Sequence, residues 1–167
     1  MTEASPAAGK QSPHQTATEL TLYEAISLAM KEAMKARDKA RLAVIRLMLA
    51  ALKQKQIDEK IELADAVVLS VLDKMVKQRR ESCRQYQAAG REDLAAQENA
   101  EIEVIKTFLP QPLSDAEIDQ AIEAAIASSG ASSMQDMGKV MALLREPMQG
   151  RADMAVISAK IKTRLGS

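Results

Sequence analysis

Aromatic residues are scarce in this chain. Tyr23, Tyr86 and Phe108 are the only three among 167 residues, and there is no tryptophan. Proteins that bind single-stranded nucleic acid without sequence preference commonly stack bases on aromatic side chains. The composition therefore argues against a base-stacking platform, and any contact with RNA is expected to run through phosphates, sugars and shape.

Cysteine and histidine each occur once, as Cys83 and His14. A single cysteine cannot form an intramolecular disulfide, and this fits a reducing compartment. One cysteine and one histidine are too few ligands for a classical structural zinc site, so no metal or other cofactor is expected. A catalytic Cys–His pair would have to take its histidine from the polar segment 1–18.

Long apolar runs are also missing. A secretory signal needs an apolar core of roughly 7–15 residues, a membrane-spanning helix needs about 20, and the chain contains neither. We therefore expect a cytoplasmic protein without a membrane span. Residues 1–18 are rich in Ala, Ser, Thr, Pro and Gln without helical periodicity, and are predicted to be a disordered tail.

Neither sign of charge predominates. The chain has 23 Lys and Arg residues against 23 Asp and Glu residues, and 47% of its residues are apolar. This composition is typical of a soluble globular protein. The balance argues against a general polyanion binder but leaves room for a local basic patch.

Apolar residues recur at helical spacing through most of the chain. Four helices are expected between residues 19 and 109: one from about 21 to 37, one from 38 that fades between 55 and 59, one over 65–89 and one over 92–108. Thr21 and Glu24 have the spacing of a capping box at the first start. No segment shows strand alternation, so the sequence predicts an all-α fold with a helical N-terminal domain at 19–109.

Pro110 and Pro112 interrupt the helical pattern and predict a linker at 110–113. A second capping box, formed by Ser114 and Glu117, opens the helix that follows. Two more helices are expected over 133–146 and 153–165. The sequence thus predicts a three-helix C-terminal domain at 114–167.

The stretch from Ser133 to Asp153 has the most specific local pattern. Pro147 is expected to end its helix at Glu146, because a proline ring disfavours the helical region for the preceding residue. Asp153 is expected to cap the last helix. Gly138 lies inside a helix, where glycine costs about 1 kcal/mol relative to alanine, and this suggests a packing or contact role.

Charged residues offer no evident catalytic site. The second and third helices are rich in Lys and Arg, which fits either a phosphate-binding face or a solvated surface that pairs with the acidic fourth helix. The second interpretation is favoured. Cys83 falls on an apolar stripe and is expected to be a packed, unreactive thiol. No residue is assigned as a nucleophile or general base.

The order and spacing of several short motifs resemble the YqeY-like proteins. This resemblance extends over nearly all of residues 20–165. The matching pieces are Arg41-Leu42, Ile45-Arg46, Ala50-Ala51-Leu52-Lys53, Gln78-Arg79-Arg80-Glu81-Ser82, Tyr86, Ala89-Gly90-Arg91, Asp93-Leu94-Ala95, Glu98, Glu101-Ile102, Phe108-Leu109-Pro110-Gln111, Asp136-Met137-Gly138-Lys139-Val140-Met141 and Gly150-Arg151-Ala152-Asp153.

YqeY-like sequences are also similar to the tail of the B subunit of the tRNA-dependent glutamyl/aspartyl-tRNA amidotransferase. That tail helps to hold tRNA, while amide transfer takes place on other parts of the enzyme. The resemblance therefore implies an all-α, non-catalytic accessory module with tRNA or a tRNA-handling enzyme as partner. Glutamine-dependent carbon–nitrogen ligase activity would attach to it by relationship alone. The alternative is a protein–protein interaction module of the translation machinery.

Gly90 is expected to fold the third and fourth helices into an antiparallel hairpin. Arg79 lies eleven residues before this glycine and Glu101 lies eleven after it, so the two should be level. Both fall near the apolar faces of their helices. We therefore predict a largely buried ion pair between Arg79 and Glu101, or between Arg79 and Glu98 if the register shifts.

A second site prediction concerns RNA. Lys139 and Arg151, together with Gly138, Arg145 and the N-terminus of the last helix, could form one phosphate-binding patch. In that patch Gly138 would permit close approach of the backbone. The alternative is that Asp153 occupies the free N–H groups as a cap and that the cations are simply solvated.

Overall fold

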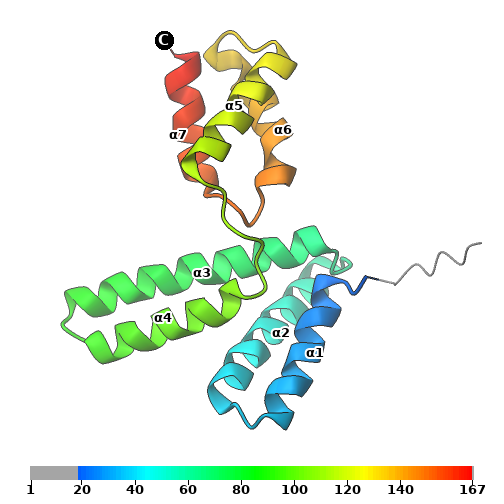
Figure 1. Cartoon of the computed structure of the whole chain (residues 1–167), viewed down its shortest axis with the longest axis vertical. Helices are drawn as coiled ribbons and strands as arrows, with labels where there is room; N and C mark the ends of the chain where they lie inside the picture. The colour runs from blue at the N-terminus through cyan, green and yellow to red at the C-terminus, as the bar shows by residue number, and fades with distance from the viewer. Residues whose placement is uncertain (1–18, 167) are drawn as a thin grey trace, which may run out of the picture.

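The computed structural model describes residues 19–166, and every regular element in that range is helical (Figure 1). The helices are α1 (Leu22–Lys35), α2 (Lys39–Glu59), α3 (Asp65–Ala88), α4 (Glu92–Lys106), α5 (Asp115–Ser129), the short 3₁₀ helix η1 (Met134–Asp136), α6 (Met137–Met148) and α7 (Met154–Leu165). The all-α prediction is confirmed. The predicted disordered tail, residues 1–18, lies outside the described residues.

Capping residues set several helix starts. At α1 the Glu24 N–H donates to Thr21 Oγ1 at 3.2 Å, and the Thr21 N–H donates to Glu24 Oε2 at 2.9 Å. Ser114 and Glu117 make the same reciprocal pair at α5, at 3.2 and 2.8 Å. Each cap satisfies backbone N–H groups that a helix start leaves unpaired, and removing one typically costs about 1 kcal/mol.

Helices α1 to α4 share one hydrophobic core. The antiparallel hairpin of α3 and α4 turns at Gly90, whose φ of 71° is a left-handed conformation that suits glycine. The α1–α2 hairpin packs against it, as Figure 1 shows. The completely buried side chains of this core are Ile26, Ile45, Met48, Leu52, Val68, Leu72 and Ile105.

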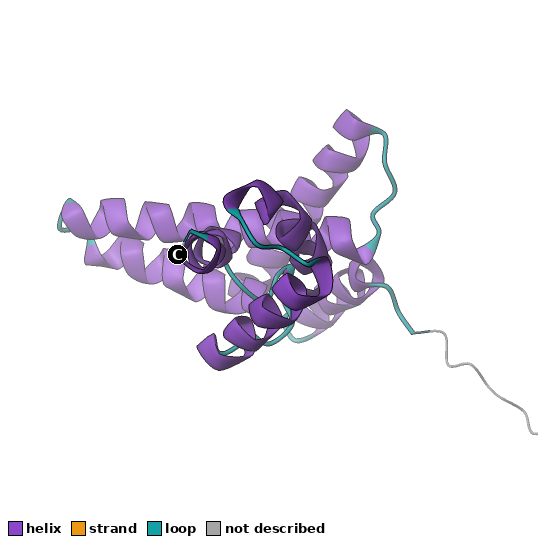
Figure 2. Ribbon diagram, turned by 90° about the horizontal axis from the view of Figure 1, so that it is seen from above, coloured by secondary structure: helices purple, strands orange, loops and turns teal. Residues whose placement is uncertain are grey.

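Helices α5 to α7 enclose a second, separate core. Its most deeply buried side chains are Ile122, Val140, Met148, Ile157 and Ile161. Figure 2 looks down on these three helices, which lie over the α3–α4 hairpin. Within residues 19–166, no helix combines the length and the apolar character that a membrane span requires.

The predicted helix over 133–146 differs in the structure at both ends. Its start is the 3₁₀ turn η1, because the Asp136 carboxylate accepts the backbone N–H groups of Ser132 and Ser133 at 3.0 and 3.2 Å. Its end lies beyond Pro147, which is inside α6. The buried Met148 packs in the second core and favours the extension of the helix by two residues beyond Glu146. Pro147 lacks a backbone donor and its ring crowds the Leu143 carbonyl, a cost that the packing of Met148 offsets.

An ion pair joins α3 to α4 near the middle of their hairpin. Arg79 Nε donates to Glu101 Oε2 at 2.9 Å, and the two side chains are 14% and 21% exposed. Glu98 is half-buried and makes no ion pair with Arg79. The hairpin therefore adopts the register in which Arg79 and Glu101 are level.

Arg79→Ala should lower the free energy of unfolding by about 1–3 kcal/mol, between the values typical of exposed and buried pairs. The loss arises because Glu101 would be left without its cation in a partly desolvated place. Urea unfolding would measure it, with Arg84→Ala as control, because Arg84 pairs with Glu81 on the exposed face of α3. Equal midpoints for the two variants would contradict the structural role of the pair.

Candidate functional site

The structure does not bring the two main cations of the predicted RNA patch together. Lys139 lies in the first turn of α6, with its side chain 70% exposed and its Nζ 3.5 Å from Asp136 Oδ1. Arg151 lies beyond the other end of α6. Most of that helix, about 14 Å of it, separates them. Lys139 and Arg151 therefore cannot act as one compact patch.

The N-terminus of α7 is already capped. Asp153 Oδ1 accepts the Ala155 N–H at 2.9 Å, which is the arrangement of the alternative interpretation. Gly138 and Arg145 are both exposed, and a Cβ built on Gly138 would have no neighbour within 4 Å. Open space at Gly138 gives no packing reason for a glycine there.

Other cations of the C-terminal helices are engaged by α5. Asp119 Oδ1 accepts hydrogen bonds from Lys160 Nζ at 2.9 Å and from Arg164 at 3.1 Å. The hydrogen bond from Lys160 has the larger effect and the one from Arg164 the smaller, and together they hold the pKa of the Asp119 carboxyl below its ordinary value. Lys160 and Arg164 thus serve the packing of α7 on α5 and are less available to a ligand.

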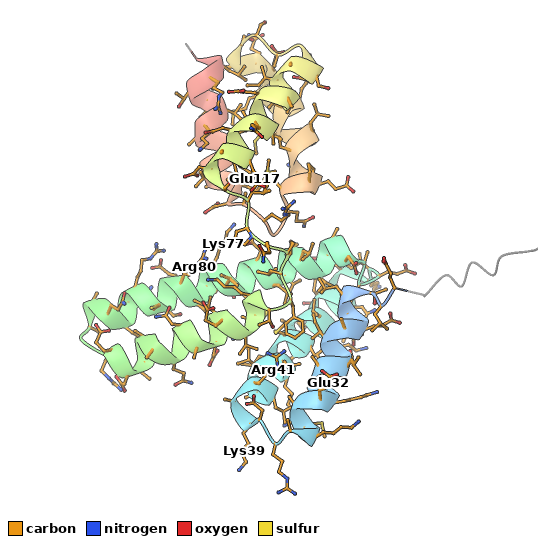
Figure 3. All side chains as sticks on the ribbon, viewed as in Figure 1. Glu32, Lys39, Arg41, Lys77, Arg80 and Glu117 are labelled. Carbon is orange, nitrogen blue, oxygen red and sulfur yellow. The ribbon has the colours of Figure 1, made fainter. Side chains whose placement is uncertain are left out.

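A cleft of about 790 Å³ lies beside residues 109–112, and we name it the linker cleft. Four cations and two carboxylates line it, from α3, the end of α4 and the turn before α7. Figure 3 shows Lys77 and Arg80 along the part of α3 that lies below the C-terminal helices. The lining residues are Asp73, Val76, Lys77, Arg80, Lys106, Thr107, Leu109, Pro110, Gln111, Pro112, Gly150, Arg151, Ala152 and Asp153.

Hydrogen bonds position Arg151 at this cleft. The Leu113 N–H donates to the Arg151 carbonyl at 2.8 Å, and Arg151 Nε donates to the Gln111 carbonyl at 3.1 Å. Gln149 Nε2 donates to the Ala66 carbonyl, at the start of α3, at 2.9 Å. The turn before α7 is therefore tied to both the linker and α3.

Gly150 allows that turn to lie close to the first core. Its φ is 71°, and a Cβ built on it would lie 3.5 Å from Leu69 Cδ2 and 3.7 Å from Leu109 Cδ2. These are ordinary contact distances, so the backbone conformation rather than a clash is what favours glycine here.

The cleft carries an excess of two positive charges, although the whole chain is neutral. Lys77 Nζ lies 3.1 Å from Asp73 Oδ2 and 3.9 Å from Asp153 Oδ1, and Lys106 pairs with Glu103 at 3.2 Å. Arg80 makes no hydrogen bond or ion pair within the described residues. Its guanidinium is thus free to meet an anion.

Sequence reasoning identified Arg151 but did not place Lys77, Arg80 and Lys106 beside it. The family motifs could have indicated the cleft, since residues from the motifs at 78–82, 108–111 and 150–153 all line it. In the described part of the chain, no three His, Cys, Asp or Glu side chains gather as metal ligands would.

Comparison with known proteins identifies the family. A family model described as Yqey-like protein matches residues 23–165. The chain belongs to the YqeY-like family. It is 33% identical over 139 residues to "Altered inheritance of mitochondria protein 41, mitochondrial" of Lachancea thermotolerans, covering 79% of this chain and 74% of that protein.

Relatives of the same name match over a shorter region. Identity is 37% for the Saccharomyces cerevisiae (strain YJM789) protein and 38% for that of Vanderwaltozyma polyspora, each over 97 residues. The match covers 56% of this chain and 52% of each relative. The chain thus spans about half the length of these two relatives.

The predicted cytoplasmic location is wrong by this comparison, because the relatives are named as mitochondrial proteins. The prediction rested on the lack of a long apolar run. That lack argues against a secretory signal and a membrane span only, since mitochondrial transit peptides are amphipathic rather than continuously apolar.

The two glycines of this region should respond to substitution in opposite directions. Gly150→Ala should lower the free energy of unfolding by about 1–2 kcal/mol, because alanine is strained at positive φ. Gly138→Ala should raise it by up to about 1 kcal/mol, because its site is helical and open. Urea unfolding of both variants would measure the changes, and equal effects would contradict these assignments.

The Asp119 cluster should make stability depend on pH. The pKa of the Asp119 carboxyl is lower in the folded state than in the unfolded state, so the unfolded state takes up the proton more readily as pH falls. The stabilisation is fully present above the ordinary aspartate pKa and is lost as pH falls through the lowered folded value.

Asp119→Asn should therefore flatten the acid side of a plot of unfolding free energy against pH. Asp58→Asn, on the exposed side of α2, is the control and should retain the wild-type shape. Superimposable curves for wild type and Asp119→Asn would refute the role of the cluster.

Proposed function

We propose that this chain is a non-catalytic accessory module that binds tRNA. Membership of the YqeY-like family supports this proposal, together with the resemblance of YqeY-like sequences to the amidotransferase B-subunit tail. No residue is assigned a catalytic role in this proposal.

The observation that carries the proposal is the charge of the linker cleft. Arg80 and Lys77 on α3, Lys106 at the end of α4 and Arg151 before α7 line one recess in an otherwise neutral protein. Lys and Arg side chains gathered in this way supply the phosphate contacts from which nucleic-acid affinity largely arises. Because aromatic residues are scarce and the described residues that line the cleft include none, the sugar–phosphate backbone is the natural target.

The same proposal includes the division of the chain. Helices α1–α4 would form one domain and α5–α7 a second, with residues 110–113 as the linker. The two separate hydrophobic cores support this division. An RNA held in the linker cleft would then contact both domains.

A second candidate is a protein–protein interaction module of the translation machinery. It is favoured by apolar side chains left exposed on the α1–α2 hairpin, where Leu28, Met34, Leu47 and Ile57 are 45–58% exposed. An exposed apolar surface of this kind would bind a hydrophobic dye to the folded protein. Dye binding at the level of an unrelated folded protein would count against this candidate.

Titration of tRNA into the full chain at stepped salt concentrations would test RNA binding. Affinity should fall as salt rises, because bound phosphates release counterions. Arg151→Ala should weaken binding and lower the log–log salt slope by about one, because Arg151 lines the linker cleft.

Lys53→Ala is the matched control, since it removes one exposed lysine from α2 and should leave the slope unchanged. Equally tight binding to unrelated duplex RNA would reduce the proposal to non-specific attraction. If tRNA fails to bind measurably at low salt, the proposed function is wrong.

A further inference from the structure

We propose that the linker cleft holds the sugar–phosphate backbone of an unpaired RNA segment, and that Lys77, Arg80 and Arg151 contact its phosphates. This inference rests on the proposed function and specifies the site and the form of RNA that it takes. Nothing in the family match assigns a ligand to this cleft. The size of the cleft, its lining and the Arg80 side chain, which is unpaired within the described residues, support this inference.

The size of the cleft favours a single strand. A volume of about 790 Å³ lies in the range of pockets that take small molecules and short ligand segments. A helical RNA duplex is too wide to enter such a recess and would meet only its rim. An unpaired segment can bend its backbone into the cleft and leave its bases outside.

The cations lie where such a backbone would run. Lys77 and Arg80 are three residues apart on α3, so they are neighbours on one face, with Cβ atoms roughly 5–6 Å apart. Arg151 lines the same cleft from the turn before α7. Lys77, Arg80 and Arg151 can therefore each contact a different phosphate of the same strand.

Arg80 is the decisive contact because it has no competing partner in the described part of the chain. Lys77 is already near Asp73 and Asp153, and Arg151 already donates to the Gln111 carbonyl. A phosphate would have to share those two side chains with their present partners. The Arg80 guanidinium has no such partner within residues 19–166 and can give a phosphate two parallel N–H donors.

The rest of the lining predicts indifference to base identity. Leu109, Pro110, Pro112 and Ala152 present apolar surface, and no aromatic side chain lines the cleft. Bases therefore find no stacking partner there, and recognition depends on the charge and flexibility of the strand. An oligouridylate, whose bases stack weakly on each other, is a suitable probe of this chemistry.

The test measures binding of a labelled oligouridylate and of a duplex RNA of matched length to the full chain by fluorescence anisotropy. The oligouridylate should bind more tightly than the duplex. Arg80→Gln should weaken oligouridylate binding about fivefold near 0.1 M salt, because one single-strand phosphate contact contributes a salt slope of about 0.7. Arg80→Lys keeps the charge and should retain most of the affinity.

Arg84→Gln is the control, because Arg84 lies one turn further along α3, pairs with Glu81 and does not line the cleft. The Arg84→Gln variant should bind oligouridylate with the same affinity as the wild-type protein. Arg80 is exposed, so its variants should melt as wild type does.

Two results would overturn the inference alone: unchanged oligouridylate affinity in Arg80→Gln, or duplex RNA bound as tightly as the oligouridylate, while tRNA still binds. Absence of all RNA binding, tRNA included, would instead overturn the proposed function together with the inference.

Discussion

The backbone hydrogen bond from the Leu113 N–H to the Arg151 carbonyl is the constraint on which the candidate site depends. It joins the end of the linker to the turn before α7 at 2.8 Å, while Arg151 reaches back to the Gln111 carbonyl. Gly150 makes this possible, because its left-handed conformation turns the chain where it contacts Leu69 and Leu109. Without this turn, residues 110–113 would be the only covalent link between α4 and α5, and the linker cleft would lose the wall that residues 150–153 form.

Ion pairing sorts the cations into structural and available ones. Arg79 joins α3 to α4 through Glu101, and Lys160 and Arg164 join α7 to α5 through Asp119. These cations are partly buried and have fixed partners. Arg80, next to Arg79 in sequence, lies about 100° around α3 from it and has no such partner within residues 19–166. A chain with no net charge can thus present a local positive surface, because some of its cations are paired with carboxylates while others, such as Arg80, are not paired in the described part of the chain.

Family membership and the structure support the functional proposal in different ways. The match over residues 23–165 establishes the YqeY-like family, and the relatives carry a name that refers to mitochondria but states no ligand. The structure contributes the place where the family motifs at 78–82, 108–111 and 150–153 meet. Because these three motifs are far apart in sequence and yet line one recess, that recess is the first place to look for a ligand.

The sequence alone determined the local features of this protein. Thr21, Ser114 and Asp153 act on backbone groups within three residues of themselves, so helix starts could be predicted from chemistry near in sequence. The pairing of Arg79 with Glu101 could be predicted because the two residues are equally far in sequence from the turn at Gly90. Only the tertiary structure decided that α6 continues through Pro147, because burial of Met148 is a packing effect. It also decided that Lys139 and Arg151 lie apart while Arg80 and Arg151 share a cleft, since the distance between residues far apart in the chain depends on how whole helices pack.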